Sequence, residues 1–269
     1  MINEAVSNDR LFLFKIYLKL RYTIMKAKIN VPTNLSEITL RQYQEFLTAQ
    51  ETNEDEHYLE HKAIEIFCHV PEEKIKTIAA HSVTEIANKI SALFADQKEL
   101  VRFFTLNKKE FGFIPNLDEI SFGEYIDIDT YLSDWKNMHY AMNVLYRPIS
   151  HKKAGRYDLV GYDTEQRDRA LQMPMDAVLG SIFFFIQFKE GLIEDYPELF
   201  SGRSGDTTSA SSAFGQKWGW YNSLYGLSKG NVERIEPITK MKMHECLMML
   251  AFTKEKNELE ARLMKQKIK

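Results

Sequence analysis

The sequence predicts a mainly α-helical protein with minor β structure: a helical body followed by a C-terminal helical hairpin. Apolar residues recur at spacings of three and four along most of the chain, for example over residues 83–93, and this period is typical of a helix with one buried face. Alternating or turn-separated apolar runs, which suit strands, are confined to residues 27–31, 103–115 and 149–172. Helices therefore dominate the expected fold.

Capping signals locate the starts of several expected helices. In a capping box, a Ser or Thr side chain accepts a hydrogen bond from the backbone three residues on, and a Glu or Gln side chain reaches back. This pattern occurs at Thr39, Ser82 and Ser121, and Pro71 and Pro174 stand where a first helical turn would begin. The helices expected from these signals and from periodicity cover residues 39–50, 58–67, a short segment after 71, 82–93, 121–145, 174–188, 216–227 and 239–267.

The first 24 residues differ from the rest of the chain. Residues 11–24 are apolar but are interrupted by basic residues, and no small-residue cleavage site follows, so they do not match a secretory signal peptide. We expect residues 1–24 to be an amphipathic surface helix, a segment translated from an upstream start codon, or a poorly ordered extension.

The remaining chain divides by composition. Residues 201–215 (SGRSGDTTSASSAFG) are small, polar and rich in glycine and serine, which is typical of a flexible linker. We therefore expect a mainly helical domain over residues 25–200, a flexible linker over residues 201–215 and a C-terminal helical hairpin over residues 216–269. A turn at residues 228–231 would separate the two helices of the hairpin.

Charge and composition exclude several classes of function. The 35 basic and 38 acidic residues give a formal net charge of -3, so we expect no nucleic acid as the main partner. The most apolar run, residues 177–188, is shorter than the roughly 20 residues that span a bilayer. It is expected to be a fully buried central helix, and no membrane partner is expected. Two cysteines, Cys68 and Cys246, are too few for a disulfide framework, which indicates a reducing cytoplasm.

One short motif suggests catalysis. His57, Glu60 and His61 fit H-x-x-E-H, in which two imidazoles four residues apart on a helix hold zinc and the glutamate activates a bound water. Cys68 could extend this cluster. A charged, solvated first helical turn explains the same residues, and we favour that interpretation. No phosphate-binding glycine loop or nucleophile elbow is present in the sequence, so we expect no cofactor, no bound metal and no enzymatic activity.

Aromatic and methionine residues are concentrated after the expected linker. Such residues either seal a small helical core or anchor a protein partner, and the sequence leaves both interpretations open. Several methionines give the last expected helix an adaptable apolar face. The candidate partner-binding residues are Trp218, Trp220, Tyr221, Tyr225 and Met243.

Three stretches of the sequence and a C-terminal segment together resemble a family of proteins encoded by tailed bacteriophages. The stretches are INVPTNLSEITLRQYQEFL (29–47), FGFIPNLDEISFGEYIDIDTYLSDWKNMHYAMNVLYRPI (111–149) and MPMDAVLGSIFFF (173–185), followed by WGWYNSLYGLSKGN. The chain resembles tail assembly chaperones and virion morphogenesis proteins, notably of phages of Bacteroidetes-type hosts. The resemblance leaves out the first 24 residues and carries no catalytic motif.

The resemblance implies a non-enzymatic role in building a phage particle. A tail assembly chaperone would bind the long helical tape-measure protein, mask its apolar stripes and pass it to the tail-tube subunits. A virion component of the neck, connector or tail is the alternative, and a zinc metallopeptidase acting through His57, Glu60 and His61 is a second one. The expected location is the cytoplasm of the infected bacterial host or the virion, and an oligomer is compatible with either role.

Overall fold

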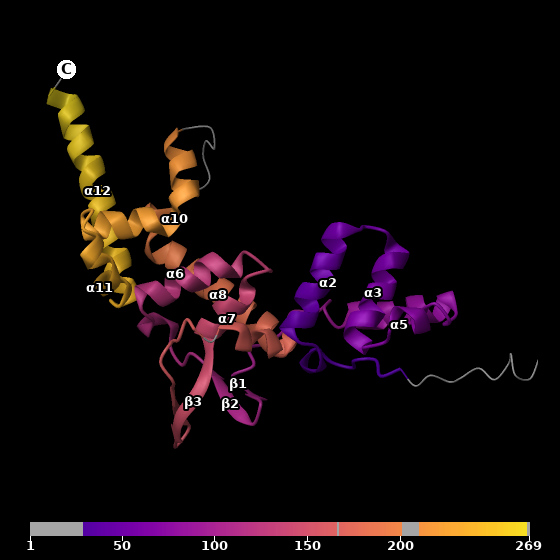
Figure 1. Ribbon diagram of the computed structural model, residues 1–269. Helices are drawn as coiled ribbons and strands as arrows, with labels where there is room; N and C mark the ends of the chain where they lie inside the picture. Colours follow the sequence, from indigo (N-terminus) through magenta and orange to yellow (C-terminus); the bar gives the residue numbers. More distant parts are fainter. Residues whose placement is uncertain (1–28, 166, 201–209, 268–269) are drawn as a thin grey trace, which may run out of the picture. The chain divides into compact units, whose positions relative to one another are not determined.

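Figure 1 shows a computed structural model of the chain, which describes residues 29–165, 167–200 and 210–267. The described part is mainly helical with one small antiparallel sheet, so the predicted fold class is confirmed. Residues 1–24 lie outside the described residues. Of the strand expected at residues 27–31, the described part, 29–31, is not a strand. No described helix has the length and apolar character needed to cross a membrane.

The first helices pack beside one another (Figure 1). They are η1 (Leu35–Glu37), α2 (Leu40–Thr52), α3 (Glu56–Cys68), α4 (Glu72–Ile75) and α5 (Ala80–Ala92), and α3 packs against both α2 and α5. Thr39 forms the predicted capping box with Gln42. The capping box predicted at Ser82 is wrong: α5 begins at Ala80, and the Ser82 amide already donates to the Ala79 carbonyl at 2.9 Å. Alanine favours the helical state, so the helix starts earlier.

The sheet consists of two hairpins joined edge to edge, in the order β1-β2-β3-β4. The first pairs β1 (Phe103–Leu106) with β2 (Lys109–Phe113), and the second pairs β3 (Tyr146–Lys153) with β4 (Arg156–Leu159). Asn107 and Lys108 have φ of 50° and 63°, as a two-residue hairpin turn requires. The hairpin over residues 103–115 was predicted, and residues 149–172, which were expected to form a short hairpin or an exposed loop, contain most of the second one. Pro148 lies within β3.

The helix expected over residues 121–145 is two helices, α6 (Phe122–Leu132) and α7 (Met138–Leu145). The capping box at Ser121 is confirmed. The break follows from Asp134, whose carboxylate accepts hydrogen bonds from the Lys136 amide at 3.0 Å and from the Asn137 side chain at 2.6 Å. A side chain that binds nearby backbone in this way competes with the helical ladder and favours a turn.

Helix α8 (Met175–Asp195) follows η3 (Arg167–Gln172) and precedes α9 (Pro197–Phe200). It starts after Pro174, as predicted, but it is not fully buried. Phe185 is buried, whereas Phe184 and Ile186 are 40% and 47% exposed. A helix that packs on one side only leaves its other side to solvent, however apolar its sequence.

The C-terminal part consists of α10 (Ala210–Ser228), η4 (Val232–Arg234), α11 (Ile235–Thr239) and α12 (Met243–Lys267). Residues 201–209 lie outside the described residues, and residues 210–215 are helical rather than linker. Thr239 ends α11 and does not cap the last helix, although that helix ends at Lys267 as predicted. The Met243 amide donates to the Ile120 carbonyl at 3.0 Å, and α11 and α12 pack on α6. These helices belong to the same compact unit as the residues from Pro32 onward.

Candidate protein-interaction site

Helix α10 bends at Gly219, which has φ 45° and ψ −126°. L-amino acids rarely adopt a positive φ with negative ψ, so glycine permits this bend. The bend separates the two tryptophans beside it. Trp218 is 43% exposed, whereas Trp220 is partly buried against α6.

Trp220 anchors α10 to the rest of the protein. Its indole Nε1 donates a hydrogen bond to Asp129 Oδ2 at 2.8 Å, and Asp129 also accepts from the Lys189 ammonium of α8. Its ring meets Phe122 edge-on with centroids 5.7 Å apart and Tyr125 edge-on at 5.3 Å. Edge-to-face geometry and a satisfied indole N–H are typical of a tryptophan that holds a fold together. Trp220 therefore holds α10 to the body, and it also lines the groove described below, so its predicted role in partner binding stays a prediction.

Met243 was also predicted to bind a partner, but this prediction is wrong. Its side chain is fully buried at the start of α12, close to the backbone contact with Ile120. The first turn of α12 packs on α6, so the apolar methionine lies on the inner side of the helix.

The other three predicted residues, Trp218, Tyr221 and Tyr225, are exposed, and we call them the aromatic surface. Their exposed fractions are 43%, 52% and 58%. Trp218 and Tyr221 lie together, with ring centroids 5.8 Å apart. Leu224 on the same helix is buried, so α10 packs through one side and presents aromatic rings on another. Rings this exposed contribute little to the core, which leaves them available for a partner.

A groove of about 650 Å³ adjoins the aromatic surface. Tyr225 lies at one side, and residues of α9, α10 and α12 form its walls, including Phe200, Leu250 and Ala261. The Lys254 ammonium donates to the Glu198 carbonyl and ties α12 to α9. Glu258, which also lines the groove, lies 3.5 Å from Arg262, four residues further along α12. The lining of the groove is mixed: apolar side chains such as Phe200 and Leu250 alternate with polar ones such as Asn222 and Thr253.

The H-x-x-E-H motif lies on α3 but does not form a metal site. The His57 side chain is 85% exposed, and its Nδ1 lies 3.3 Å from Glu60 Oε2. Cys68 is buried at the end of α3, and burial raises the pKa of its thiol to about 11. Among the described residues, no three His, Cys, Asp or Glu side chains are placed to hold a metal ion. His57 lies in the solvated first turn of α3, whereas Glu60 and His61 follow in the next turn and are only partly exposed.

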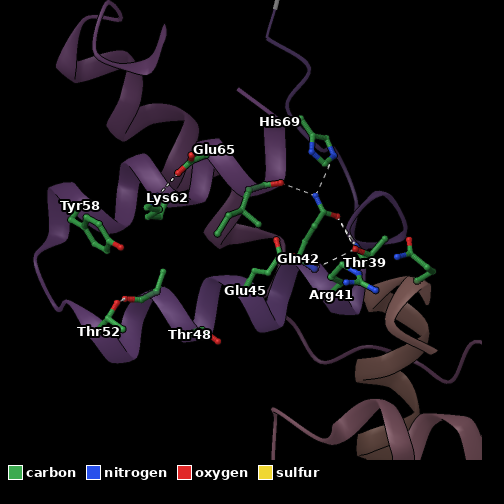
Figure 2. A pocket seen from close by; sticks show the side chains of 13 residues that line it. Thr39, Arg41, Gln42, Glu45, Thr48, Thr52, Tyr58, Lys62, Glu65 and His69 are labelled. Carbon is green, nitrogen blue, oxygen red and sulfur yellow. Dashed lines mark hydrogen bonds and ion pairs between the residues drawn. The ribbon is translucent and has the colours of Figure 1, made fainter. Parts of the chain in front are cut away.

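A polar pocket of about 710 Å³ between α2 and α3 was not predicted (Figure 2). The Gln42 amide donates to the Ile66 carbonyl at 2.8 Å, and its oxygen accepts from the Thr39 amide at 2.9 Å. Lys62 and Glu65 pair at 2.5 Å across its rim. Its central side chains therefore hold the two helices together, and its charges are of both signs.

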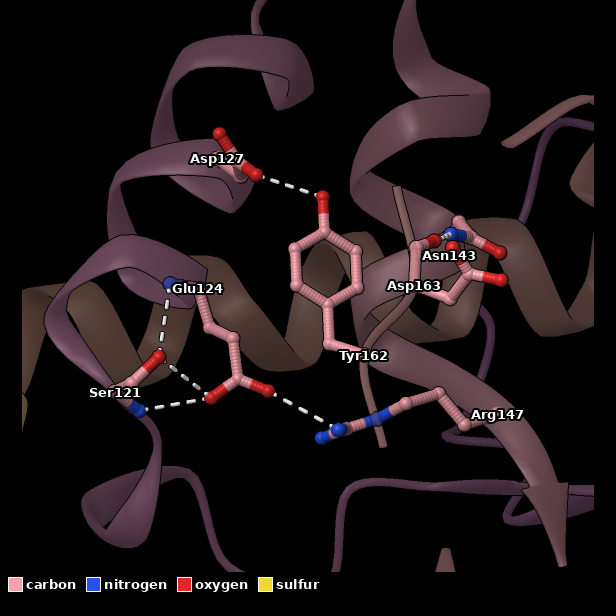
Figure 3. Close-up of polar contacts among 7 residues, drawn as sticks. All are labelled: Ser121, Glu124, Asp127, Asn143, Arg147, Tyr162 and Asp163. Carbon is pink, nitrogen blue, oxygen red and sulfur yellow. Dashed lines mark hydrogen bonds and ion pairs between the residues drawn. The ribbon is translucent and has the colours of Figure 1, made fainter. Parts of the chain in front are cut away.

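The acidic residues of α6 also serve to connect elements (Figure 3). Glu124 accepts from the Ser121 amide at 2.8 Å and pairs with Arg147 of β3 at 3.1 Å. Asp127 accepts a hydrogen bond from the Tyr162 hydroxyl at 2.7 Å. These contacts give both carboxylates a structural role, since each joins α6 to a separate part of the chain.

The apolar face expected on the last helix extends further along α12 than the methionines that predicted it. Met249, Phe252, Leu259 and Leu263 are each between 48% and 61% exposed. Their spacing was detectable in the sequence, but the charges between them suggested a fully solvated face. Comparison of the chain with family models, with curated proteins and with solved structures gave no match.

Proposed function

We propose that this chain is a non-enzymatic phage morphogenesis protein, a tail assembly chaperone that binds the tape-measure protein through its aromatic surface. The observation that carries the proposal is the division within α10. Leu224 and Trp220 hold the helix to the body, whereas Trp218, Tyr221 and Tyr225 stay exposed. Tryptophan and tyrosine are the side chains that most often dominate the binding energy of protein interfaces.

The groove beside Tyr225 suits a helical partner. An amphipathic helix binds a groove by placing apolar residues at spacings of three and four into it. A tape-measure protein is long and helical and carries such stripes, so the groove and the aromatic surface together can cover one of them. The Tyr hydroxyls and the Trp indole N–H also let the exposed rings face water, as the surface of an unbound chaperone must between binding events.

The small extent of the aromatic surface favours reversible binding. The proposed contact consists of three exposed rings and one groove, and transient complexes use smaller interfaces than permanent ones. A permanent neck or tail component would need a larger interface. The transient role is therefore the one we propose, and the structural role is the alternative.

Site-specific photo-crosslinking in phage-producing cells tests the proposal. A photoreactive phenylalanine analogue replaces Tyr225 in one variant and Val160, which is also exposed but lies after β4, in the control. We expect a crosslink to the tape-measure protein from position 225 and none from position 160. Equal crosslinking from both positions, or none to a tail protein, would refute the proposal.

A metal measurement tests the non-enzymatic part. We expect purified protein to hold no stoichiometric zinc and His57→Ala to change neither metal content nor stability, because the His57 side chain is exposed and paired only with Glu60. One equivalent of zinc in the native protein that is lost in His57→Ala would favour the metallopeptidase.

A further inference from the structure

The second half of α12 is exposed on all sides. Residues 255–267 are all exposed, whereas Met243, Leu247 and Ala251 in the first half are buried against the body. Figure 1 shows α12 (yellow) running to the C-terminus. A single helix exposed to water on every side is only marginally stable, because helical propensity alone rarely overcomes the cost of nucleation. A partner for this half of the helix would stabilise it.

Four exposed apolar residues of α12 and one lysine follow a heptad pattern. Met249, Phe252, Lys256, Leu259 and Leu263 are separated by three, four, three and four residues, and we call them the α12 seam. At about 100° per residue they fall within an arc of about 80°. Alternating spacings of three and four define the seam through which two helices pack side by side.

The α12 seam and the groove lie on opposite sides of the helix. Met243, Leu247 and Ala251, which pack on the body, point away from the seam by helical geometry. The groove-lining residues Leu250 and Ala261 share that inner side. A helix that approaches the seam therefore meets neither the body nor the aromatic surface.

The charges beside the seam select the occupant. When two copies of α12 lie antiparallel with Phe252 facing Leu263, each Glu255 lies on the same edge as Arg262 of the other copy. When they lie parallel, Glu255 faces Glu260 and Arg262 faces Lys267. Opposite charges that flank a seam favour an alignment and like charges oppose it. The flanking charges are thus complementary in the antiparallel pair only.

We propose that α12 forms an antiparallel two-helix contact with α12 of a second copy of this chain, through the α12 seam. The bodies then lie on the outer sides of the helix pair, because each packs on the inner side of its own α12. Lys256 faces Leu259 of the other copy, which lowers the stability of the contact and fixes its register. With a seam of two heptads, the dimer is weak and depends on concentration.

Sedimentation velocity of the full chain, from micromolar to near-millimolar concentration, tests this proposal. We expect a reversible monomer–dimer equilibrium. Leu259→Glu raises the dimer Kd more than about tenfold, because a carboxylate enters the apolar seam. Lys256→Leu lowers the Kd, because it removes a charge from the seam. Both side chains are exposed in the monomer, so the circular dichroism spectrum stays unchanged.

Charge variants test the orientation. Glu255→Lys raises the Kd roughly three- to tenfold, and adding Arg262→Glu restores it, because the exchanged charges attract again in the antiparallel pair. Glu194→Lys, the same change on an exposed residue of α8, has no effect. A monomer at every concentration would overturn the proposal, as would a tighter dimer in Glu255→Lys, which a parallel pair predicts. Photo-crosslinking from position 225 in the Leu259→Glu variant separates this proposal from the proposed function. If the aromatic surface binds the partner, the crosslink persists even when the variant is monomeric.

Discussion

Replacement of Trp220 by alanine tests whether this residue is an anchor of the fold. The variant loses the hydrogen bond from Nε1 to Asp129 and both edge-on ring contacts, with Phe122 and Tyr125. Lys189 remains beside Asp129, so the carboxylate keeps one partner. The matched control is Trp218→Ala, which removes the same side chain two positions earlier from the exposed side of α10.

The contacts of Trp220 set the expected size of the effect. A hydrogen bond to a charged acceptor contributes about 1.5–3 kcal/mol, and each aromatic pair adds about 0.5–1.5 kcal/mol. A fully buried tryptophan costs about 3–5 kcal/mol when truncated to alanine. Because Trp220 is only partly buried, we expect Trp220→Ala to lower the free energy of unfolding by about 3 kcal/mol. Trp218→Ala should change it by less than about 1 kcal/mol.

Urea denaturation followed by circular dichroism measures both changes without depending on tryptophan fluorescence. For a chain of this size, about 3 kcal/mol corresponds to a fall in Tm of about 6–12 °C. Equal losses in the two variants would refute the division of α10 into an anchoring side and an exposed side. A Trp220→Ala variant as stable as the native protein would do the same.

Two further predictions concern packing and protonation. A Cβ at Gly180 would lie 2.2 Å from the Glu99 carbonyl oxygen, so Gly180→Ala forces α8 away from that backbone. We expect it to lower the free energy of unfolding, measured by urea denaturation, by about 1–3 kcal/mol. Gly191→Ala on the same helix, where a Cβ meets open space, should instead raise it by about 0.5–1 kcal/mol. Burial raises the pKa of the Cys68 and Cys246 thiols from 9.0 to about 11. The folded state therefore keeps protons that the unfolded state releases, and the resulting stability, complete below pH 9, is lost as the pH rises toward 11. The urea midpoint should therefore fall as the pH rises across this range. Both thiols should react slowly with an alkylating reagent at pH 8 until the protein unfolds. A urea midpoint that does not change with pH, or rapid alkylation of the folded protein, would contradict the burial of the thiols.

Local signals in the sequence predicted most of the elements. The capping boxes at Thr39 and Ser121 involve atoms within four residues of each other, so the pattern contains nearly all the information that the structure uses. The turn at Asn107 and Lys108 is equally local. At Ser82 the same pattern failed because the two alanines before it extend the helix, and a pattern match does not compare competing starts.

The orientation of the aromatic residues depended on distant parts of the chain. Trp220 turns inward because Gly219 adopts a positive φ and because Asp129, on α6, accepts its indole hydrogen. Helical spacing aligns Trp218, Tyr221 and Tyr225, the three rings that are exposed, but it carries no information on the bend at Gly219 that turns Trp220 inward. The burial of Met243 likewise follows from the contact of its amide with Ile120. The α12 seam, by contrast, was detectable from its heptad spacing.

Mass spectrometry of purified virions against lysate of infected cells decides whether the protein acts transiently in particle assembly. The aromatic surface and its groove suit reversible binding to a helical partner, so the protein should be abundant in the lysate and absent from the particles. A fixed number of copies per particle would contradict the chaperone role and make the protein a structural component of the virion.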